Sequence, residues 1–331
     1  MALIVQKFGG TSVADPAARE RMLEKVTAAR ARGDRVIVVV SAMGRKGAPY
    51  ATDTLLGLLD EAGAAQADGP GRDLLATCGE TISACLVAAR LTARGVKSVP
   101  MTAYTAGIRA SGSYGDAEIS DVDADRILAV VDSGSVPVIT GFQAVAPNGC
   151  LVTIGRGGSD TSAVAVGAWT KADFVDIYTD VPGVATADPR LVPEAPFLER
   201  LDYRSMYRLA SNGARVLHDR SALLGERFGV SIRVRSTFDD GDGTLISAEP
   251  LPPGSPAVLG IAADKSAATA TVAIVCKAGG ASSIAATAAA AAATAGGAPV
   301  QGSDADVVAF SCAANDVPGL VKALFEAVAV R

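Results

Sequence analysis

Short runs of apolar and β-branched residues alternate along the chain with stretches whose apolar residues recur at helical spacing. Several of the short runs, such as 36–41, are apolar at consecutive positions, which is typical of strands buried on both faces. Such an alternation predicts an α/β fold, in which a mainly parallel sheet lies between two layers of helices as a three-layer αβα sandwich. The strands are expected over 3–8, 36–41, 97–102, 136–140, 174–179 and 231–234, and the helices over 19–32, 71–94, 124–133, 160–171, 203–212 and 220–227.

The first expected strand runs into a lysine, a glycine pair and two hydroxyls, in the order Lys7-Phe8-Gly9-Gly10-Thr11-Ser12. Glycines let backbone N–H groups approach phosphate oxygens, the helix expected to follow presents its positive end, and the lysine adds a charge. The spacing is neither that of a P-loop nor that of the dinucleotide-binding fingerprint. Taken alone, the segment fits an ordinary strand-to-helix turn as well as a phosphate site.

A second glycine-rich turn, within 153–163, carries Arg156 and Asp160 beside Gly157 and Gly158. It combines a guanidinium, backbone donors and a carboxylate within a few residues at the start of an expected helix. Parallel sheets place their active sites beyond the carboxyl ends of the strands. The polar residues at such ends are Lys7, Ser41, Thr140, Thr179 and Asp180.

Seven short motifs occur along the chain, namely KFGGTS, SAMG, GE..S, TGFQ, GRGGSDTSA, YTDV.GV.TADPR and LAS.GA.VLH. In this order and at these intervals they resemble the aspartate kinases of the amino-acid kinase family, over residues 1 to 247. An ordered set of motifs is far more specific than any single motif. The resemblance implies the amino-acid kinase fold and ATP-dependent phosphorylation of the β-carboxylate of L-aspartate, which gives β-aspartyl phosphate.

The implied reaction needs charge compensation and alignment more than a base, because a carboxylate is already an anion at neutral pH. By resemblance, Lys7 neutralises the β- and γ-phosphates of ATP, while Gly157 and Gly158 cradle the transferring phosphoryl group. Asp160 orients Lys7 and lies near Mg²⁺, which enters with ATP and has no dedicated protein site. The implied catalytic residues are Lys7, Gly10, Gly157, Gly158 and Asp160, and the implied nucleotide-binding residues are Lys7, Gly9, Gly10, Thr11, Ser12, Thr179, Asp180, Asp188, Arg190 and Arg215.

Recognition of an amino acid needs one group for the α-ammonium and another for the α-carboxylate. By resemblance, Glu80 binds the ammonium group and Arg156 binds a carboxylate. The hydroxyls of Ser41, Thr52 and Ser159 are expected to support them. Without the motifs, residues of these types are more often surface charges and helix caps.

A proline-rich segment at 248–256 cannot continue a helix or strand and predicts a linker between two domains. The catalytic domain is expected over 1–247 and a reduced domain over 257–331. The smaller domain resembles one ACT-like α+β unit, where aspartate kinases generally carry two, and we expect it to support a homodimer or higher homo-oligomer. Its alanine-rich helix offers few polar groups to bind lysine or threonine. Its strands are expected over 258–262, 269–277 and 307–312, and its helices over 282–294 and 317–328.

The formal charge of −5 is mild, and no basic stripe indicates a nucleic-acid partner. The alanine-rich stretch 285–295 is too short to span a bilayer, and no secretory leader is apparent, so we expect a cytoplasmic protein without a membrane partner. The five cysteines have no metal-ligand spacing and are expected to be buried thiols. His218 is the only histidine, which excludes a multi-histidine metal site, and we expect it to be structural.

Several of these residues also fit simpler roles when the sequence is taken alone. Asp160 fits a helix N-cap, and Asp188 fits a plain turn. Arg215 stands where the family usually has lysine and could keep a nucleotide contact with a different geometry. Thr81 stands where glutamine is common, and the loop 45–51 before Thr52 is altered; both lie near the expected substrate end, so a modified aspartate or another amino dicarboxylate is an alternative substrate. A catalytically silent, nucleotide-binding regulatory partner is a further alternative, although such a protein is free to lose the residues that are intact here: Lys7, Arg156, Asp160 and Asp180.

Overall fold

The computed structural model describes residues 1–331 except 64–68, 156, 253, 266–268, 301–303 and 330–331. The described residues form two compact units. The first comprises Met1–Pro182 and Arg227–Asp242, and the second comprises Gly183–Glu226 and Gly243–Arg331. The segment 248–256 lies within the second unit, and the division into a catalytic and a smaller domain at this segment stays a prediction.

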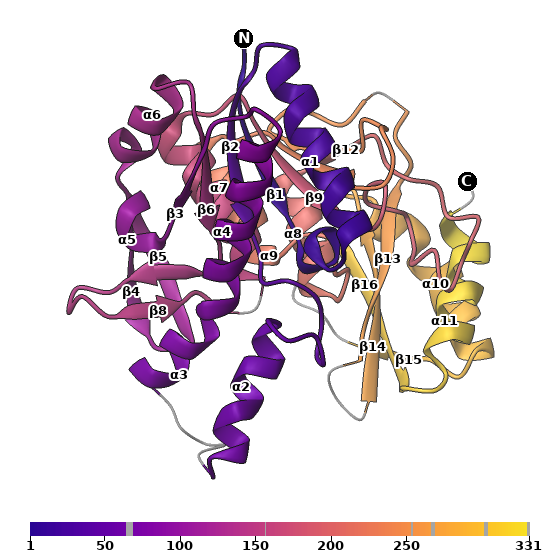
Figure 1. The fold of residues 1–331 in the computed structure, drawn as a ribbon. Helices are drawn as coiled ribbons and strands as arrows, with labels where there is room; N and C mark the ends of the chain where they lie inside the picture. The colour runs from indigo at the N-terminus through magenta and orange to yellow at the C-terminus, as the bar shows by residue number, and fades with distance from the viewer. Residues whose placement is uncertain (64–68, 156, 253, 266–268, 301–303, 330–331) are drawn as a thin grey trace. The chain divides into compact units, whose positions relative to one another are not determined.

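A parallel sheet forms the centre of the first unit (Figure 1). Its strands lie in the order β11-β9-β1-β2-β6-β3, and all the pairs between them are parallel. The strands are β1 (Leu3–Phe8), β2 (Arg35–Val40), β3 (Ser98–Met101), β6 (Val136–Thr140), β9 (Phe174–Thr179) and β11 (Ile232–Ser236). Each strand expected from the sequence in this region is therefore confirmed, to within two residues at its ends.

Two helices cover each face of this sheet. Helices α1 (Pro16–Ala31) and α4 (Cys78–Ala93) pack on one face, and α6 (Ala124–Asp132) and α7 (Gly158–Thr170) pack on the other. Because successive strand residues point to opposite faces, Phe8 joins the core under α1 while the neighbouring Lys7 points to the α7 side. The predicted three-layer α/β sandwich is confirmed. Its core on the α1 side includes Phe8, Met22, Leu23, Val36, Val38, Val87 and Leu91.

Two local features differ from the expectation. A 3₁₀ turn, η1 (Gly10–Val13), begins within the first glycine pair and precedes α1, and Asp15 caps α1 by accepting the N–H of Ala18 at 2.9 Å. The N-terminus of α1 is therefore occupied by a side chain of the protein. The helix expected over 71–94 is divided at Thr77 into α3 (Pro70–Ala76) and α4, and the Thr77 carbonyl accepts a hydrogen bond from Gln143 at 3.3 Å.

A second sheet of the first unit was not predicted. It has the strand order β5-β4-β7-β8, with antiparallel hairpins β4-β5 and β7-β8. Its strands are short or place polar and small residues between the apolar ones, so they lack the apolar runs that reveal the central sheet. The elements missed here are α2 (Thr52–Glu61), α5 (Ala103–Ala106), β4 (Ile108–Ser113), β5 (Asp116–Val122), β7 (Gln143–Val145) and β8 (Leu151–Thr153).

The second unit contains a separate antiparallel sheet in the order β13-β14-β16-β15. Helices α10 (Ala281–Thr294) and α11 (Val317–Leu324) pack against this sheet. This arrangement confirms the small α+β, ACT-like region. The strands of this sheet are β13 (Val258–Asp264), β14 (Thr269–Cys276), β15 (Ala298–Val300) and β16 (Val307–Ala313). The unit also contains β10 (Arg200–Asp202), α8 (Tyr203–Ser211), the first part of α9 (Asp219–Phe228), β12 (Thr244–Ser247) and the short π-helix η2 (Phe325–Ala329). Three strands of this unit, β10, β12 and β15, were not predicted.

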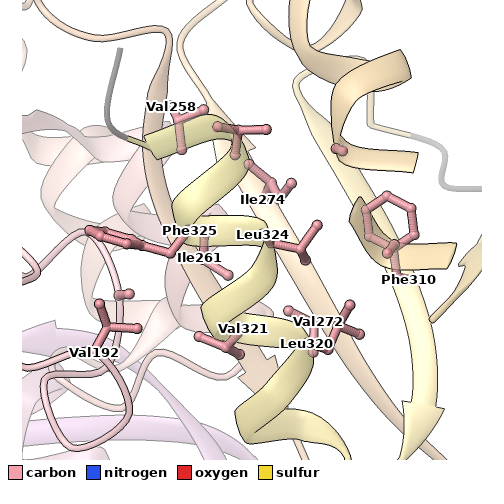
Figure 2. Packing of buried hydrophobic residues seen from close by; sticks show 14 of the residues in the cluster. Val192, Val258, Ile261, Val272, Ile274, Phe310, Leu320, Val321, Leu324 and Phe325 are labelled. Carbon is pink, nitrogen blue, oxygen red and sulfur yellow. The ribbon is translucent and has the colours of Figure 1, made fainter. Parts of the chain in front are cut away.

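The core of this region lies between the sheet and α11 (Figure 2). Leu320, Leu324 and Phe325 pack against residues of the sheet such as Val272 and Ile274, all of them buried. Helix α10 buries only alanines along its length, so its contribution to this core is small. All five cysteines are free: Cys276 and Cys312 are buried and Cys78 and Cys150 are half-buried, but Cys85 is exposed, so the expectation of buried thiols was wrong for that residue.

Candidate active site

A cavity of about 740 Å³ opens in the first unit, at the carboxyl ends of β1 and β2. It is bounded by the loop after β2, the N-terminus of α2, the helices α3 and α4, and the N-terminus of α7. Residues predicted from the sequence as catalytic or substrate-binding line it together, although they are far apart in the chain. They are Lys7, Gly10, Ser41, Thr52, Glu80, Gly157, Gly158, Ser159 and Asp160.

An ion pair joins the first and second glycine-rich segments inside this cavity. The Nζ atom of Lys7 lies 2.6 Å from Oδ1 of Asp160, and each side chain is only 11% exposed. Lys7 is placed by β1, and Asp160 by the first turn of α7. With so little water around them, the two charges compensate each other more strongly than a surface pair does.

Backbone geometry explains the glycines of the second segment, which we call the glycine turn (Gly155, Gly157 and Gly158). Gly157 has a φ of 71°, in the left-handed region that glycine adopts without strain. At Gly158 an added Cβ would lie 2.5 Å from the Cγ1 atom of Ile154, so no larger residue fits there unless Ile154 moves. Helix α7 begins at Gly158, and its positive N-terminal end therefore borders the cavity.

Glu80 is a buried carboxylate on the first turn of α4, with 2% of its surface exposed. Its Oε1 atom accepts the N–H of Ala42 at 3.1 Å, whereas Oε2 is buried without a hydrogen-bond partner among the described residues. Burial raises the pKa of Glu80 from 4.5 to about 7. A buried carboxylate with a free oxygen at a cavity is suited to bind a cationic group of a ligand.

The raised pKa of Glu80 predicts a pH-dependent cost to the stability of the free protein. Below pH 4.5 the carboxyl is protonated in both the folded and the unfolded state, whereas above pH 7 the folded state must bury its charge. We therefore expect Glu80→Gln to raise the free energy of unfolding at pH 8 by up to about 3 kcal/mol, and much less at pH 5. Urea unfolding at the two pH values measures the difference. The same stabilisation at both would contradict the assigned titration.

The supporting hydroxyls that the sequence predicted also lie on the cavity. Ser41 follows β2, Thr52 is the first residue of α2, and Ser159 is in the first turn of α7. Ser159 packs closely against Gly141, where an added Cβ would lie 2.7 Å from its side chain. Arg156, the predicted carboxylate ligand, lies outside the residues that the structure describes.

Gly9, Thr11 and Ser12 flank Gly10, which lines the cavity. The hydroxyl of Ser12 is fully buried and lies 2.7 Å from that of Thr237, while the N–H of Ser12 donates to the carbonyl of Gly9 at 2.9 Å. Both donors of Ser12 are thus engaged within the protein. The predicted contacts of Gly9, Thr11 and Ser12 with a nucleotide stay predictions.

The remaining predicted nucleotide residues divide between the units. Thr179 ends β9 in the first unit and Asp180 follows it, with the Arg45 guanidinium 3.6 Å from the Asp180 carboxylate. In the second unit, Arg190 donates two hydrogen bonds to the Asp188 side chain, at 2.9 and 2.7 Å, and this pairing lowers the pKa of Asp188. Arg215 also belongs to the second unit. Their nucleotide-binding role stays a prediction.

Several lining residues were not predicted. Phe142 is the clearest, because its φ of 68° is strained for a bulky residue and such strain is concentrated at functional sites. Ser162 stabilises this conformation by accepting the N–H of Phe142 at 3.0 Å. A sequence carries no sign of such a backbone angle. Other charged lining residues to which the sequence assigned no role are Arg45, Lys46, Asp53, Arg72 and Asp73.

Two further properties bear on possible ligands. Within the described residues, there is no group of three or more histidine, cysteine, aspartate and glutamate side chains that could hold a metal ion. The run Pro70–Ala93 is long and apolar enough to cross a membrane by length and composition alone, but half of it is buried inside the protein. Its second part, α4, packs on the central sheet and supplies Glu80 to the cavity, so α4 is a helix of the protein core.

Comparison with known proteins gives a consistent set of relatives. The chain is 44% identical to Aspartokinase 1 of Bacillus subtilis over 250 residues, which are 75% of this chain and 61% of that protein. It is 41% identical to the aspartokinase of Mycolicibacterium smegmatis over 277 residues, covering 82% of this chain and 64% of the relative. The chain thus spans about three-fifths of the length of the curated relatives that it matches.

Solved structures agree with these sequence matches. Aspartate kinase from Synechocystis is 32% identical, with a TM-score of 0.66 over 97% of this chain and 54% of that one. E. coli aspartokinase III in complex with aspartate and ADP has the same fold, with a TM-score of 0.83 at 21% identity over 98% of this chain and 99% of that one. The family model for the amino acid kinase family matches residues 2–236, and the chain belongs to this family.

Proposed function

We propose that this protein is an aspartate kinase, which transfers the γ-phosphoryl group of ATP to the β-carboxylate of L-aspartate. The observation that carries the proposal is the joint placement in one cavity of the Lys7–Asp160 pair and the buried Glu80 carboxylate. Lys7 of the pair would bind an anionic phosphate, and Glu80 would bind an ammonium group. The curated relatives named aspartokinase support the choice of aspartate over other amino dicarboxylates.

The polyphosphate of ATP fits the positive part of the cavity. Lys7, the N-terminal end of α7 and the glycine turn supply positive charge and backbone flexibility there, and more positive charge comes from Arg45 and Lys46. We infer that Mg²⁺ enters with the nucleotide and lies near Asp160, whose carboxylate is a suitable hard oxygen ligand. When bound, Mg²⁺ neutralises part of the phosphate charge.

The amino acid would then bind beside the phosphate, with its ammonium group at Glu80 and its α-carboxylate at Arg156. The hydroxyls of Ser41, Thr52 and Ser159 are available to orient the two carboxylates of the substrate. The β-carboxylate is already ionised at neutral pH, so the protein needs no general base and aligns two anions instead. Lys7 compensates the negative charge that accumulates as the β-carboxylate approaches the phosphoryl group.

Location, assembly and domain division complete the proposal. A cytoplasmic location agrees with the placement of α4, which packs on the central sheet. We infer a homodimer or higher homo-oligomer formed through 257–331, in which the antiparallel sheet of the second unit would make the contact. We also retain 1–247 as the catalytic domain, because the family model ends at residue 236.

Trapping of the acyl phosphate with hydroxylamine tests the proposed activity. The purified protein is incubated with ATP, Mg²⁺ and one of three substrates: aspartate, glutamate or a substituted aspartate. We expect hydroxamate from aspartate at the highest kcat/KM. A higher value with a substituted aspartate or glutamate would identify the alternative amino dicarboxylate, and no hydroxamate from any of them would favour a catalytically silent partner.

A further inference from the structure

Asp73 is a buried carboxylate on the wall of the cavity that has no part in the proposed reaction. It lies on α3, with 2% of its surface exposed. One oxygen, Oδ2, accepts two backbone N–H groups, that of Thr153 at 2.7 Å and that of Gly115 at 2.9 Å. The two donors belong to segments that are separate in the chain, so Asp73 joins three parts of the cavity wall.

The two N–H groups that donate to Asp73 belong to segments that border the cavity. Thr153 is the last residue of β8 and lies two residues before Gly155, where the glycine turn begins. Gly115 is at the tip of the hairpin between β4 and β5. Both donor residues line the cavity as Asp73 does. The hydrogen bonds therefore act at the entry to the turn that we propose for the phosphoryl group.

The chemistry of the contact favours a strong constraint. Hydrogen bonds to an ionised acceptor are about twice as strong as those between neutral groups. A buried N–H that loses its acceptor is destabilising, so removal of the carboxylate would leave two unsatisfied donors or release the two segments. If water filled the space left by the carboxylate, the N–H groups of Thr153 and Gly115 would no longer be held by one atom, and the glycine turn could move.

We propose that Asp73 is a positioning residue, which holds the entry to the glycine turn and the tip of the β4-β5 hairpin together on the wall of the cavity. The proposal rests on the proposed function for its kinetic readout only. It predicts that the acceptor oxygen matters more than the charge, because the single oxygen Oδ2 accepts both N–H groups.

Three variants separate positioning from general stability. Asp73→Asn keeps an acceptor oxygen, whereas Asp73→Ala removes it. Asp202→Ala is the matched control, because Asp202 also accepts a backbone N–H, from Ser205 at 2.8 Å, and a hydroxyl, but it caps α8 in the second unit. If Asp73→Ala does not fold, Asp73→Ser takes its place, because its shorter side chain cannot reach both donors.

We expect Asp73→Ala to lower kcat for aspartate phosphorylation about ten- to hundredfold, since misplacement by 1 Å can cost that much. Asp73→Asn should stay within about threefold of the wild type, because a neutral acceptor retains about half the strength of the charged hydrogen bond. Asp202→Ala should lower the melting temperature and leave kcat unchanged. Equal losses in the Asn and Ala variants, or a folded Ala variant with normal kcat, would overturn the proposal.

Hydrogen exchange provides a readout that does not depend on activity. Mass spectrometry of peptides containing Gly115 and Thr153 should show faster exchange in Asp73→Ala than in the wild type, Asp73→Asn or Asp202→Ala. Unchanged exchange in the Ala variant would overturn the positioning role whatever the enzyme phosphorylates. A wild-type protein without aspartate kinase activity, in contrast, would contradict the proposed function and leave the exchange experiment intact.

Discussion

Replacement of Lys7 by alanine should lower kcat for aspartate phosphorylation by at least about a hundredfold, because it removes charge compensation that strengthens in the transition state. The structure adds a second reason. Asp160 lies 2.6 Å from Lys7 and is nearly buried, so the variant would remove a positive charge from beside a shielded carboxylate in a cavity that has to accept ATP. We expect weaker ATP binding as well as slower chemistry.

Lys25→Ala is the matched control for this experiment. Lys25 also forms an ion pair of 2.6 Å and is similarly shielded, with 12% of its side chain exposed, but its partner Asp240 is fully exposed and neither residue lines the cavity. Initial rates and circular dichroism are measured on both variants at one temperature. Near-normal kcat in a folded Lys7→Ala protein would remove Lys7 from the proposed mechanism.

Glu80→Gln should raise KM for aspartate by at least about thirtyfold and change KM for ATP little, because a charge-assisted contact to the ammonium group is replaced by a neutral one. Glutamine has nearly the same shape and can still accept the N–H of Ala42, so the loss measures the charge. Glu24→Gln on the outer face of α1, where the side chain is 52% exposed, serves as the control. A larger change in KM for ATP than for aspartate would reverse the proposed division of the site.

The pH dependence of KM gives the same assignment a second test. Glu80 must be ionised to bind an ammonium group, and burial raises its pKa to about 7 in the free protein. KM for aspartate should therefore rise as the pH falls below about 7, whereas in Glu80→Gln this dependence should be lost. A profile that is the same in both proteins would show that another group controls binding.

The central sheet could be predicted because its strands are buried on both faces. Runs such as Arg35–Val40 are apolar at nearly every position, and the helices between them have a different period. Strands β4 and β5 could not be found in this way. They alternate polar and small residues, and their pairing depends on contacts that a local pattern does not contain.

The candidate site could also be predicted in part, because some of its lining residues belong to the sequence motifs and others do not. Motif positions brought together Lys7, Glu80 and Asp160, which are distant in sequence but line one cavity. Asp73 was missed because an aspartate on an apolar helix has no signature of its own, and its importance lies in two backbone donors from other segments. Phe142 was missed because its left-handed backbone is set by neighbouring hydrogen bonds, not by its type.

Identification of the product tests the proposed function most directly. The purified protein is incubated with ATP, Mg²⁺ and L-aspartate, and borohydride is then added to reduce any acyl phosphate to the corresponding alcohol. Phosphorylation of the β-carboxylate predicts that homoserine is formed, and only when ATP is present. The amount of homoserine should be much lower with Lys7→Ala than with the wild type. The isomer 3-amino-4-hydroxybutanoate, which arises from the α-carboxylate, or the absence of any reduced product while the folded protein binds ATP, would contradict the proposed reaction.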